Sequence, residues 1–207
     1  AIAIDTSNNE TSDIIKVNAQ NAEIISLTDY WPMKAGNYWK FSDGSSYTIE
    51  VKDTTRYPST NVFKAPWKNP DQSGEMTHVF NDSRGLGDYG AYYFDSSGNS
   101  TKGTGFDYSP PKKGAEQNFS LPYTYELTHA QCVPHNGSCS GSNKIINTWT
   151  KVSPISTPKG TFSDVILWEE YWVSQGWHWY IWLAKDVGII KYKTDTNEGL
   201  LSDYQLK

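Results

Sequence analysis

The chain has 207 residues, 20% of them charged and 14% aromatic, and its 23 Asp and Glu against 18 Lys and Arg give a net charge of −5. The length allows one substantial hydrophobic core, so we expect a single domain. The charges are spread without a basic run, which argues against a nucleic-acid partner because phosphate binding needs clustered cationic side chains.

Residues 1–22 are polar and show little periodicity, so we predict a flexible or edge-pairing lead-in before one domain of residues 23–207. The opening "AIAIDTSNNETSD" is typical of a mature protein whose signal peptide has been removed, although an excised domain would look the same. No apolar run reaches the roughly 18 to 20 residues of a membrane span. We therefore expect a secreted or cell-envelope protein.

Short apolar or alternating segments beyond residue 22 are separated by Gly, Pro, Asn and Asp at strand-like intervals. The segment "SYTIEVKDT" (46–54) alternates with period two, which predicts a strand with one solvent-exposed face. The segment "NKIINTWTKVSPI" (143–155) predicts another strand that ends at a proline. Because the helical period persists nowhere, we predict an all-β fold, an antiparallel sandwich or curled half-barrel with long loops.

Residues 56–113 carry much of the proline and glycine. Within them we predict only brief strands, at "EMTHVF" (75–80) and "AYYFD" (91–95), and loops elsewhere. Loops of this length on a compact domain often carry the function.

The two cysteines, Cys132 and Cys139, flank turn-forming residues in "CVPHNGSCSG". We predict that they form a disulfide, which chain-entropy arguments value at about 2.5 kcal/mol and which indicates an oxidising compartment. Two reduced thiols are the main alternative. A metal pair completed by His135 is a lesser one, because the ligand set would be incomplete.

The most aromatic stretch, "LWEEYWVSQGWHWYIWLAK" (167–185), predicts a hairpin of residues 165–173 and 177–190 around a Ser174-Gln175-Gly176 turn. Both faces of each strand carry aromatic side chains. Either protein covers both faces, or one face is a platform for a ligand. Each enclosed Trp buries some 150–250 Å², and the chain has nine, so we expect most of these rings in the core.

Flat aromatic rings stack on the C–H faces of sugars while polar neighbours bind the hydroxyls, a usual design for small-ligand sites. We therefore predict non-catalytic binding of an extracellular glycan or small polar ligand, with carbohydrate favoured. The candidate ligand-binding residues are Trp168, Trp172, Trp182, Tyr180, His178 and Glu170 of the hairpin, with Trp67, Tyr92 and Tyr93 from the preceding region. The alternatives are a polysaccharide hydrolase or lyase, and an envelope-assembly or hydrophobic-ligand carrier protein.

Catalytic signatures are lacking in the sequence. There is no G-x-S-x-G elbow, and the four histidines show no HExxH spacing, so we expect no metal, no cofactor and, on balance, no enzyme. Glu169 and Glu170 are adjacent on a predicted strand and point to opposite faces, so they cannot form a glycosidase pair. One of them could still pair with Glu50 or Glu126 on another strand.

Three segments together resemble uncharacterised secreted proteins and lipoproteins of bacteria. They are "YWPMKAGNYWKF" (30–41), "TPKGTFSDVILWEEY" (157–171) and "WLAKDVGIIKYKT" (182–194). They carry the Y-x-P-x-x-x-G-N-x-W, P-x-G-x-F and V-G-I-I-K patterns. The resemblance implies an exported antiparallel β domain without an established chemistry. Gly36 and Gly160 are expected at turns before strands, and Gly188 at a bulge or a close backbone approach.

Overall fold

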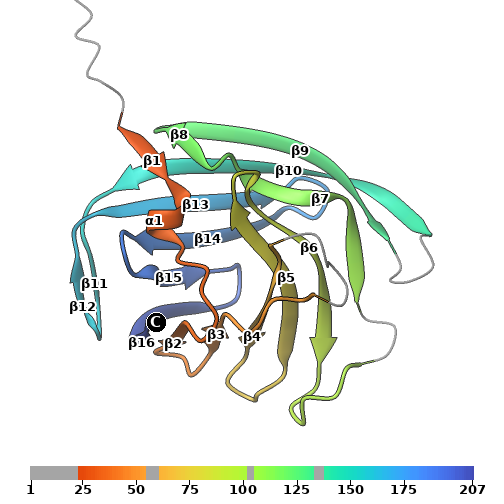
Figure 1. Cartoon of the computed structure of the whole chain (residues 1–207), viewed down its shortest axis with the longest axis horizontal. Coiled ribbons are helices and arrows are strands. Elements are labelled where there is room, and N and C mark those ends of the chain that lie inside the picture. The colour runs from red at the N-terminus through yellow and green to blue at the C-terminus, as the bar shows by residue number, and fades with distance from the viewer. Residues whose placement is uncertain (1–22, 55–60, 102–104, 133–137) are drawn as a thin grey trace, which may run out of the picture.

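The computed structural model describes residues 23–54, 61–101, 105–132 and 138–207 (Figure 1). The predicted lead-in, residues 1–22, lies outside the described residues. The one helix of the described part, α1 (Leu27–Tyr30), has four residues. Across these ranges, no helix is long and apolar enough to cross a membrane.

Twelve strands form a closed barrel in which every neighbouring pair is antiparallel (Figure 1). In order around the barrel they are β10 (Cys139–Val152), β13 (Val165–Trp172), β14 (Trp177–Ala184), β15 (Gly188–Lys193), β16 (Glu198–Gln205), β2 (Tyr38–Phe41), β3 (Ser46–Thr48), β4 (Phe63–Lys68), β5 (Gly74–Asp82), β6 (Gly85–Phe94), β7 (Phe106–Ala115) and β9 (Tyr123–Cys132). Two further two-stranded sheets are β1 (Ile24–Ser26) with β8 (Asn118–Ser120) and β11 (Ile155–Thr157) with β12 (Gly160–Phe162).

The predicted all-β fold is confirmed, but the sandwich and the half-barrel are wrong, because the sheet closes on itself. Closure depends on a pairing between the two ends of the domain. Strand β16 pairs with β2, with Gln205 opposite Tyr38 and Leu201 opposite Phe41. This contact joins residues more than 150 positions apart in the chain, which local sequence patterns do not report.

The prediction of loops over most of residues 56–113 is also wrong. Strands β4, β5, β6 and β7 occupy much of this region and form one wall of the barrel. Glycine is used here for close strand packing: a Cβ on Gly87 would lie 2.2 Å from the carbonyl oxygen of Lys112. The pairing of β6 with β7 also shifts register between Asp88 and Gly90. Glycines inside such bulged strands resemble turn signals in the sequence.

Helix α1 packs against the end of β5 that is remote from Gly74. The Asn81 side-chain amide donates hydrogen bonds to the carbonyl oxygens of Leu27 and Trp31, at 3.2 and 3.0 Å. The Asp186 amide, in the turn between β14 and β15, donates to the Asp29 carbonyl at 2.7 Å. These bonds fix the N-terminal segment across the strand ends, and Trp31 then enters the barrel interior.

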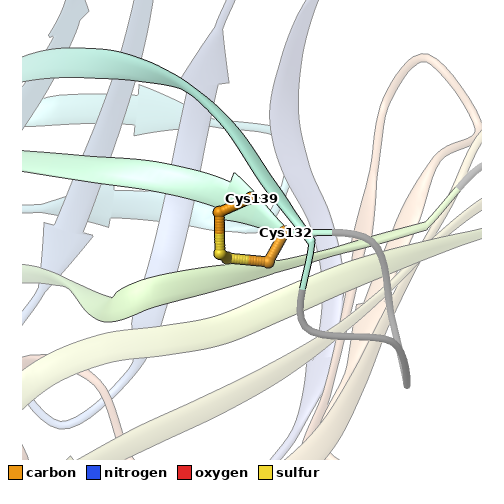
Figure 2. Close-up of a disulfide and its surroundings, with 2 residues drawn as sticks. All are labelled: Cys132 and Cys139. Atoms are coloured by element: carbon orange, nitrogen blue, oxygen red, sulfur yellow. A yellow bond between two sulfur atoms is a disulfide. The ribbon is translucent and has the colours of Figure 1, made fainter.

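The predicted disulfide is confirmed. Cys132 and Cys139 are directly paired on β9 and β10 and are bonded to each other (Figure 2). The bond therefore joins the end of β9 to the start of β10, at the base of the loop that connects these strands. The turn residues between them, 133–137, lie outside the described residues.

The segments 30–41 and 182–194 meet at one point in the core. The Trp39 indole N–H donates to the carbonyl oxygen of Val187 at 2.7 Å, and the ring covers Gly188. Gly188 has φ +96°, and a Cβ there would lie 2.7 Å from the Trp39 ring. The expected close approach at Gly188 is thus present.

Replacing Gly188 by Ala should lower the free energy of unfolding by about 2–4 kcal/mol, because positive-φ strain adds to overpacking against a buried ring. Gly176→Ala is the matched control: its φ is +70°, yet nothing lies within 4 Å of its added Cβ. It should cost only about 1 kcal/mol from strain alone. Urea unfolding of both variants measures the difference. Equal losses would contradict the contact with Trp39.

Candidate functional site

The barrel encloses a cavity of about 770 Å³. An eight-stranded barrel has room for its own side chains or one small ligand, and the diameter grows with strand number, so twelve strands leave more interior space. Gln175, in the turn after β13, and residues 194–197, in the turn after β15, also line the cavity, and most of these turn residues are exposed. The cavity therefore reaches solvent at this end, and its volume lies in the range of small-molecule sites.

Aromatic rings form most of the cavity wall. The rings that line it are Trp31, Tyr47, Trp67, Tyr93, Phe106, Tyr108, Trp168, Trp172, Trp177, Trp179 and Tyr192. Two of them mark the open end, since Trp177 is 57% exposed and Tyr93 is 38% exposed. The others pack on one another further inside; Trp67, for example, contacts Tyr192 edge to face with ring centres 4.7 Å apart.

A buried ion cluster lies within these rings. The Lys112 ammonium, on β7, lies 3.1 Å from Asp88 Oδ2 and 3.2 Å from Glu170 Oε1. The Trp172 indole N–H donates to the same Glu170 oxygen at 2.6 Å. The ammonium also lies 5.4 Å from the centres of the Tyr108 and Trp172 rings, within the range of cation–π attraction. Side chains from β6 and β13 thus surround the ammonium group that β7 carries.

Burial and mutual repulsion shift the acidity of this cluster. Burial raises the pKa of Asp88 to about 6, although Lys112 opposes the shift. Burial likewise raises the pKa of Glu75, on β5, to about 7, with Lys112 opposing and the other two carboxylates adding to the increase. Burial lowers the pKa of Lys112, but the attraction of Asp88 and Glu170 outweighs it and holds that pKa well above its ordinary value.

Several buried polar atoms of residues that line the cavity have no hydrogen-bond partner among the described residues. They are the Trp31 indole N–H, the Tyr47 hydroxyl, Asp88 Oδ1 and Glu170 Oε2. Tyr47 interacts electrostatically with Trp31 and Thr77, and Asp88 with the Gly90 amide, but none of these contacts reaches hydrogen-bonding geometry. An unsatisfied buried polar group costs about 1–3 kcal/mol, so such a cluster requires an explanation.

The barrel separates the predicted ligand-binding residues into groups. Six of them are among the residues that line the cavity: Trp67, Tyr93, Trp168, Glu170, Trp172 and His178. Tyr180 and Trp182 lie on the opposite face of β14, and the His178 side chain stacks with Tyr180 there. The prediction combined residues from both faces of the hairpin. The strand register places these residues on opposite faces, because Trp168 pairs with Ile181 whereas Trp182 pairs with Leu167.

Tyr92 belongs to neither group. Its hydroxyl donates to Asp107 at 2.9 Å, and its ring meets that of His78 edge to face. It alternates with the cavity-lining Tyr93 along β6, so it faces away from the interior.

The aromatic row on the outer face of the hairpin is stacked on itself. His178 lies between Tyr171 and Tyr180, with ring centres 4.4 and 5.7 Å apart and planes within 18° and 8° of parallel. The next ring, Trp182, is covered by the Lys191 ammonium at 4.7 Å. Because the ring faces contact one another or a cation, they do not present a flat platform to a sugar. The cavity is therefore the better candidate site.

Sequence reasoning did not identify Lys112, Asp88, Glu75, Trp31 or Tyr47 as site residues. Lys112 and Asp88 lie in stretches predicted to be loop, whereas Glu75 begins a predicted brief strand. A register shift also separates Asp88 from the regular alternation of β6. For Tyr47 a signal was present: it shares one face of its alternating segment with Ile49, and both side chains are buried.

The fold and the site together define a closed β-barrel with an aromatic, acidic interior cavity. No model of a known protein family matches the chain, and no curated protein matches it. Among solved structures, a protein of Parabacteroides distasonis provisionally named a lipoprotein is similar, with 15% identity, a TM-score of 0.31, and coverage of 84% of this chain and 97% of that one. A provisionally named exported protein with a YmcC-like fold from Bacteroides fragilis has 10% identity and a TM-score of 0.29, covering 86% of this chain and 99% of its own.

Proposed function

We propose that this protein is an exported, non-catalytic binding protein whose ligand occupies the barrel cavity, and that carbohydrate is the favoured ligand class. The observation that supports the proposal is the set of unpartnered buried polar atoms that belong to residues lining an aromatic cavity. Trp31 and Tyr47 offer hydrogen-bond donors, while Asp88 and Glu170 offer acceptors. A sugar hydroxyl both donates and accepts, and a pyranose ring presents C–H faces to indole rings, so the wall matches a sugar in both respects.

The location follows from the disulfide. Disulfides persist in oxidising compartments and are rare in the cytosol, and the bond between Cys132 and Cys139 supports export. A carrier of purely apolar ligands fits less well, because such a ligand would leave the unpartnered oxygens of Asp88 and Glu170 without a polar partner.

A second candidate is a hydrolase that acts on polysaccharide. The observation that favours it is that burial raises the pKa values of Glu75 and Asp88 to about 7 and about 6, and a carboxyl group that is protonated near neutral pH can serve as a general acid. Incubating the protein with each polysaccharide it binds, and measuring new reducing ends, tests this candidate. Release that is lost in Glu75→Gln would favour the enzyme over the binding protein.

Removing the rim rings should weaken glycan binding without unfolding the protein. We expect Trp177→Ala and Tyr93→Ala each to raise Kd for a soluble glycan about tenfold, which corresponds to the loss of about 1.4 kcal/mol of contact. Both residues are partly exposed at the cavity mouth, so their removal leaves the core packing unchanged. Titration calorimetry against a panel of oligosaccharides measures the effect.

Trp182→Ala is the matched control for that experiment, since it removes the same type of ring from the outer face of β14. It should leave Kd unchanged. If the Trp182 variant loses binding and the rim variants keep it, the ligand binds outside the barrel. If no oligosaccharide shields the tryptophans from quenching by acrylamide, carbohydrate is the wrong class.

A further inference from the structure

Glu75 differs from the other charged groups of the cavity because it has no countercharge in contact. Asp88 and Glu170 share Lys112, whereas Glu75 makes no hydrogen bond or ion pair with any described residue. Its side chain is partly accessible because it faces the cavity. It is therefore an acidic group that is positioned to meet a ligand.

Aromatic rings flank Glu75 on both sides. On β4 its direct partner is Trp67, and on β6 its direct partner is Tyr93. Directly opposite residues in antiparallel strands point to the same face with Cβ atoms about 5 Å apart, and all three side chains line the cavity. A carboxylate between two aromatic rings is the arrangement that binds ammonium groups, through charge attraction and cation–π contact.

The charge of the whole cavity favours the same kind of ligand. Among the described residues that line it, Glu75, Asp88, Glu170 and Asp195 are acidic and Lys112 alone is a lysine or arginine. Asp88 and Glu170 are only 8% and 6% exposed, and each has one buried oxygen without a hydrogen-bond partner. The acidic residues thus exceed the single cation, and an incoming positive charge would reduce that imbalance.

We propose that the ligand carries a positively charged nitrogen, and that this group binds the Glu75 carboxylate between the rings of Trp67 and Tyr93. The inference rests on the proposed function, because it names the chemistry of the ligand that the cavity holds. An amino sugar and a sugar that bears a quaternary ammonium group both have this chemistry.

Choline tests the inference, with dimethylbutanol, its neutral isostere with carbon in place of nitrogen, as the matched probe. We expect choline to bind at least about tenfold more tightly in tryptophan-fluorescence titrations, because only the charged probe gains the ion pair and the cation–π contact. Glu75→Gln should remove this preference. Asp195→Asn, which removes an acidic group from the mouth of the cavity, should change the choline Kd by less than about twofold, since exposed charges are screened.

The pH dependence provides a second readout. Choline keeps its charge at every pH, so any change of its affinity with pH reflects ionisation of groups in the protein. Burial raises the pKa of Glu75 to about 7, with Lys112, Asp88 and Glu170 as the charged groups acting on it, and only its ionised form attracts the cation. Affinity should therefore increase about tenfold from pH 6 to pH 8 in the unmodified protein. In Glu75→Gln the increase should be at most about twofold, because only Asp88, whose pKa is about 6, still ionises over this range.

The outcomes separate the two proposals. If neutral oligosaccharides bind while choline and its isostere bind equally, the charged-nitrogen inference is overturned and the binding function stands. If the Glu75→Gln variant keeps the full choline preference, the inference is likewise wrong. If neither the oligosaccharides nor choline protect the tryptophans, both proposals fail.

Discussion

Lys112→Met should destabilise the protein by about 3–5 kcal/mol at pH 8, the usual cost of removing one partner from a buried ion cluster. Methionine is similar in length to lysine and leaves little empty space, so the loss of stability reflects the loss of the positive charge. Without the ammonium, Asp88 and Glu170 are left as adjacent buried carboxylates. Denaturant unfolding followed by circular dichroism measures the loss.

The same variant should recover stability in acid. The pKa of Asp88 is already raised to about 6 against an ordinary value of 3.8, and Lys112 opposes that rise. Removing Lys112 raises this pKa further. A carboxyl group whose pKa is raised by folding stabilises the folded state below its unfolded pKa, and loses that contribution as pH increases through the folded pKa. The deficit of the variant should therefore be smaller at pH 5 than at pH 8.

Lys113→Met is the matched control, because Lys113 is the next residue and pairs with the half-exposed Glu116 at 2.6 Å. A surface pair of this kind contributes less than about 1 kcal/mol. Similar losses in the two variants, or a Lys112→Met deficit that is constant with pH, would show that the interior cluster does not depend on the ammonium.

Trp149→Ala should reduce the free energy of unfolding by about 3–5 kcal/mol, because truncating a fully buried indole removes apolar contact and leaves a cavity. Trp149, on β10, is completely buried and stacks on Trp168 with ring centres 5.0 Å apart and planes 5° from parallel. Its indole N–H also donates to the Gly114 carbonyl at 3.1 Å. The variant therefore loses packing and leaves a buried carbonyl without its partner.

Trp177→Ala provides the comparison for this prediction, since it deletes the same side chain at a site that is 57% exposed. It should change stability by less than about 0.5 kcal/mol. Thermal unfolding of the two variants measures the contrast. If Trp149→Ala is as mild as Trp177→Ala, the stacked pair does not contribute to the core as described.

The local sequence pattern was sufficient to predict the structure where strands alternate regularly between the two faces of the sheet. The turn at Ser174-Gln175-Gly176 is correct, with Gly176 at φ +70° and its amide donating to the Trp172 carbonyl at 2.8 Å. The division of the hairpin into two aromatic faces is also correct in register. Where the second predicted strand (177–190) was expected to continue, the chain turns at residues 185–187 and forms β14 and β15 instead. Asp186 adopts φ +59° in this turn. Asp tolerates this conformation but is common elsewhere, so the residue alone did not predict the turn.

The sequence by itself determined the all-β class, the disulfide between Cys132 and Cys139, and the concentration of aromatic rings on one hairpin, because composition, spacing and period-two alternation are local properties. Only the tertiary structure decided that the sheet closes, since closure depends on the pairing of β16 with β2 across the chain. Closure in turn decided which aromatic face lines a cavity. It also brought Lys112, Asp88, Glu170 and Glu75 together from four strands, a convergence that no local pattern records.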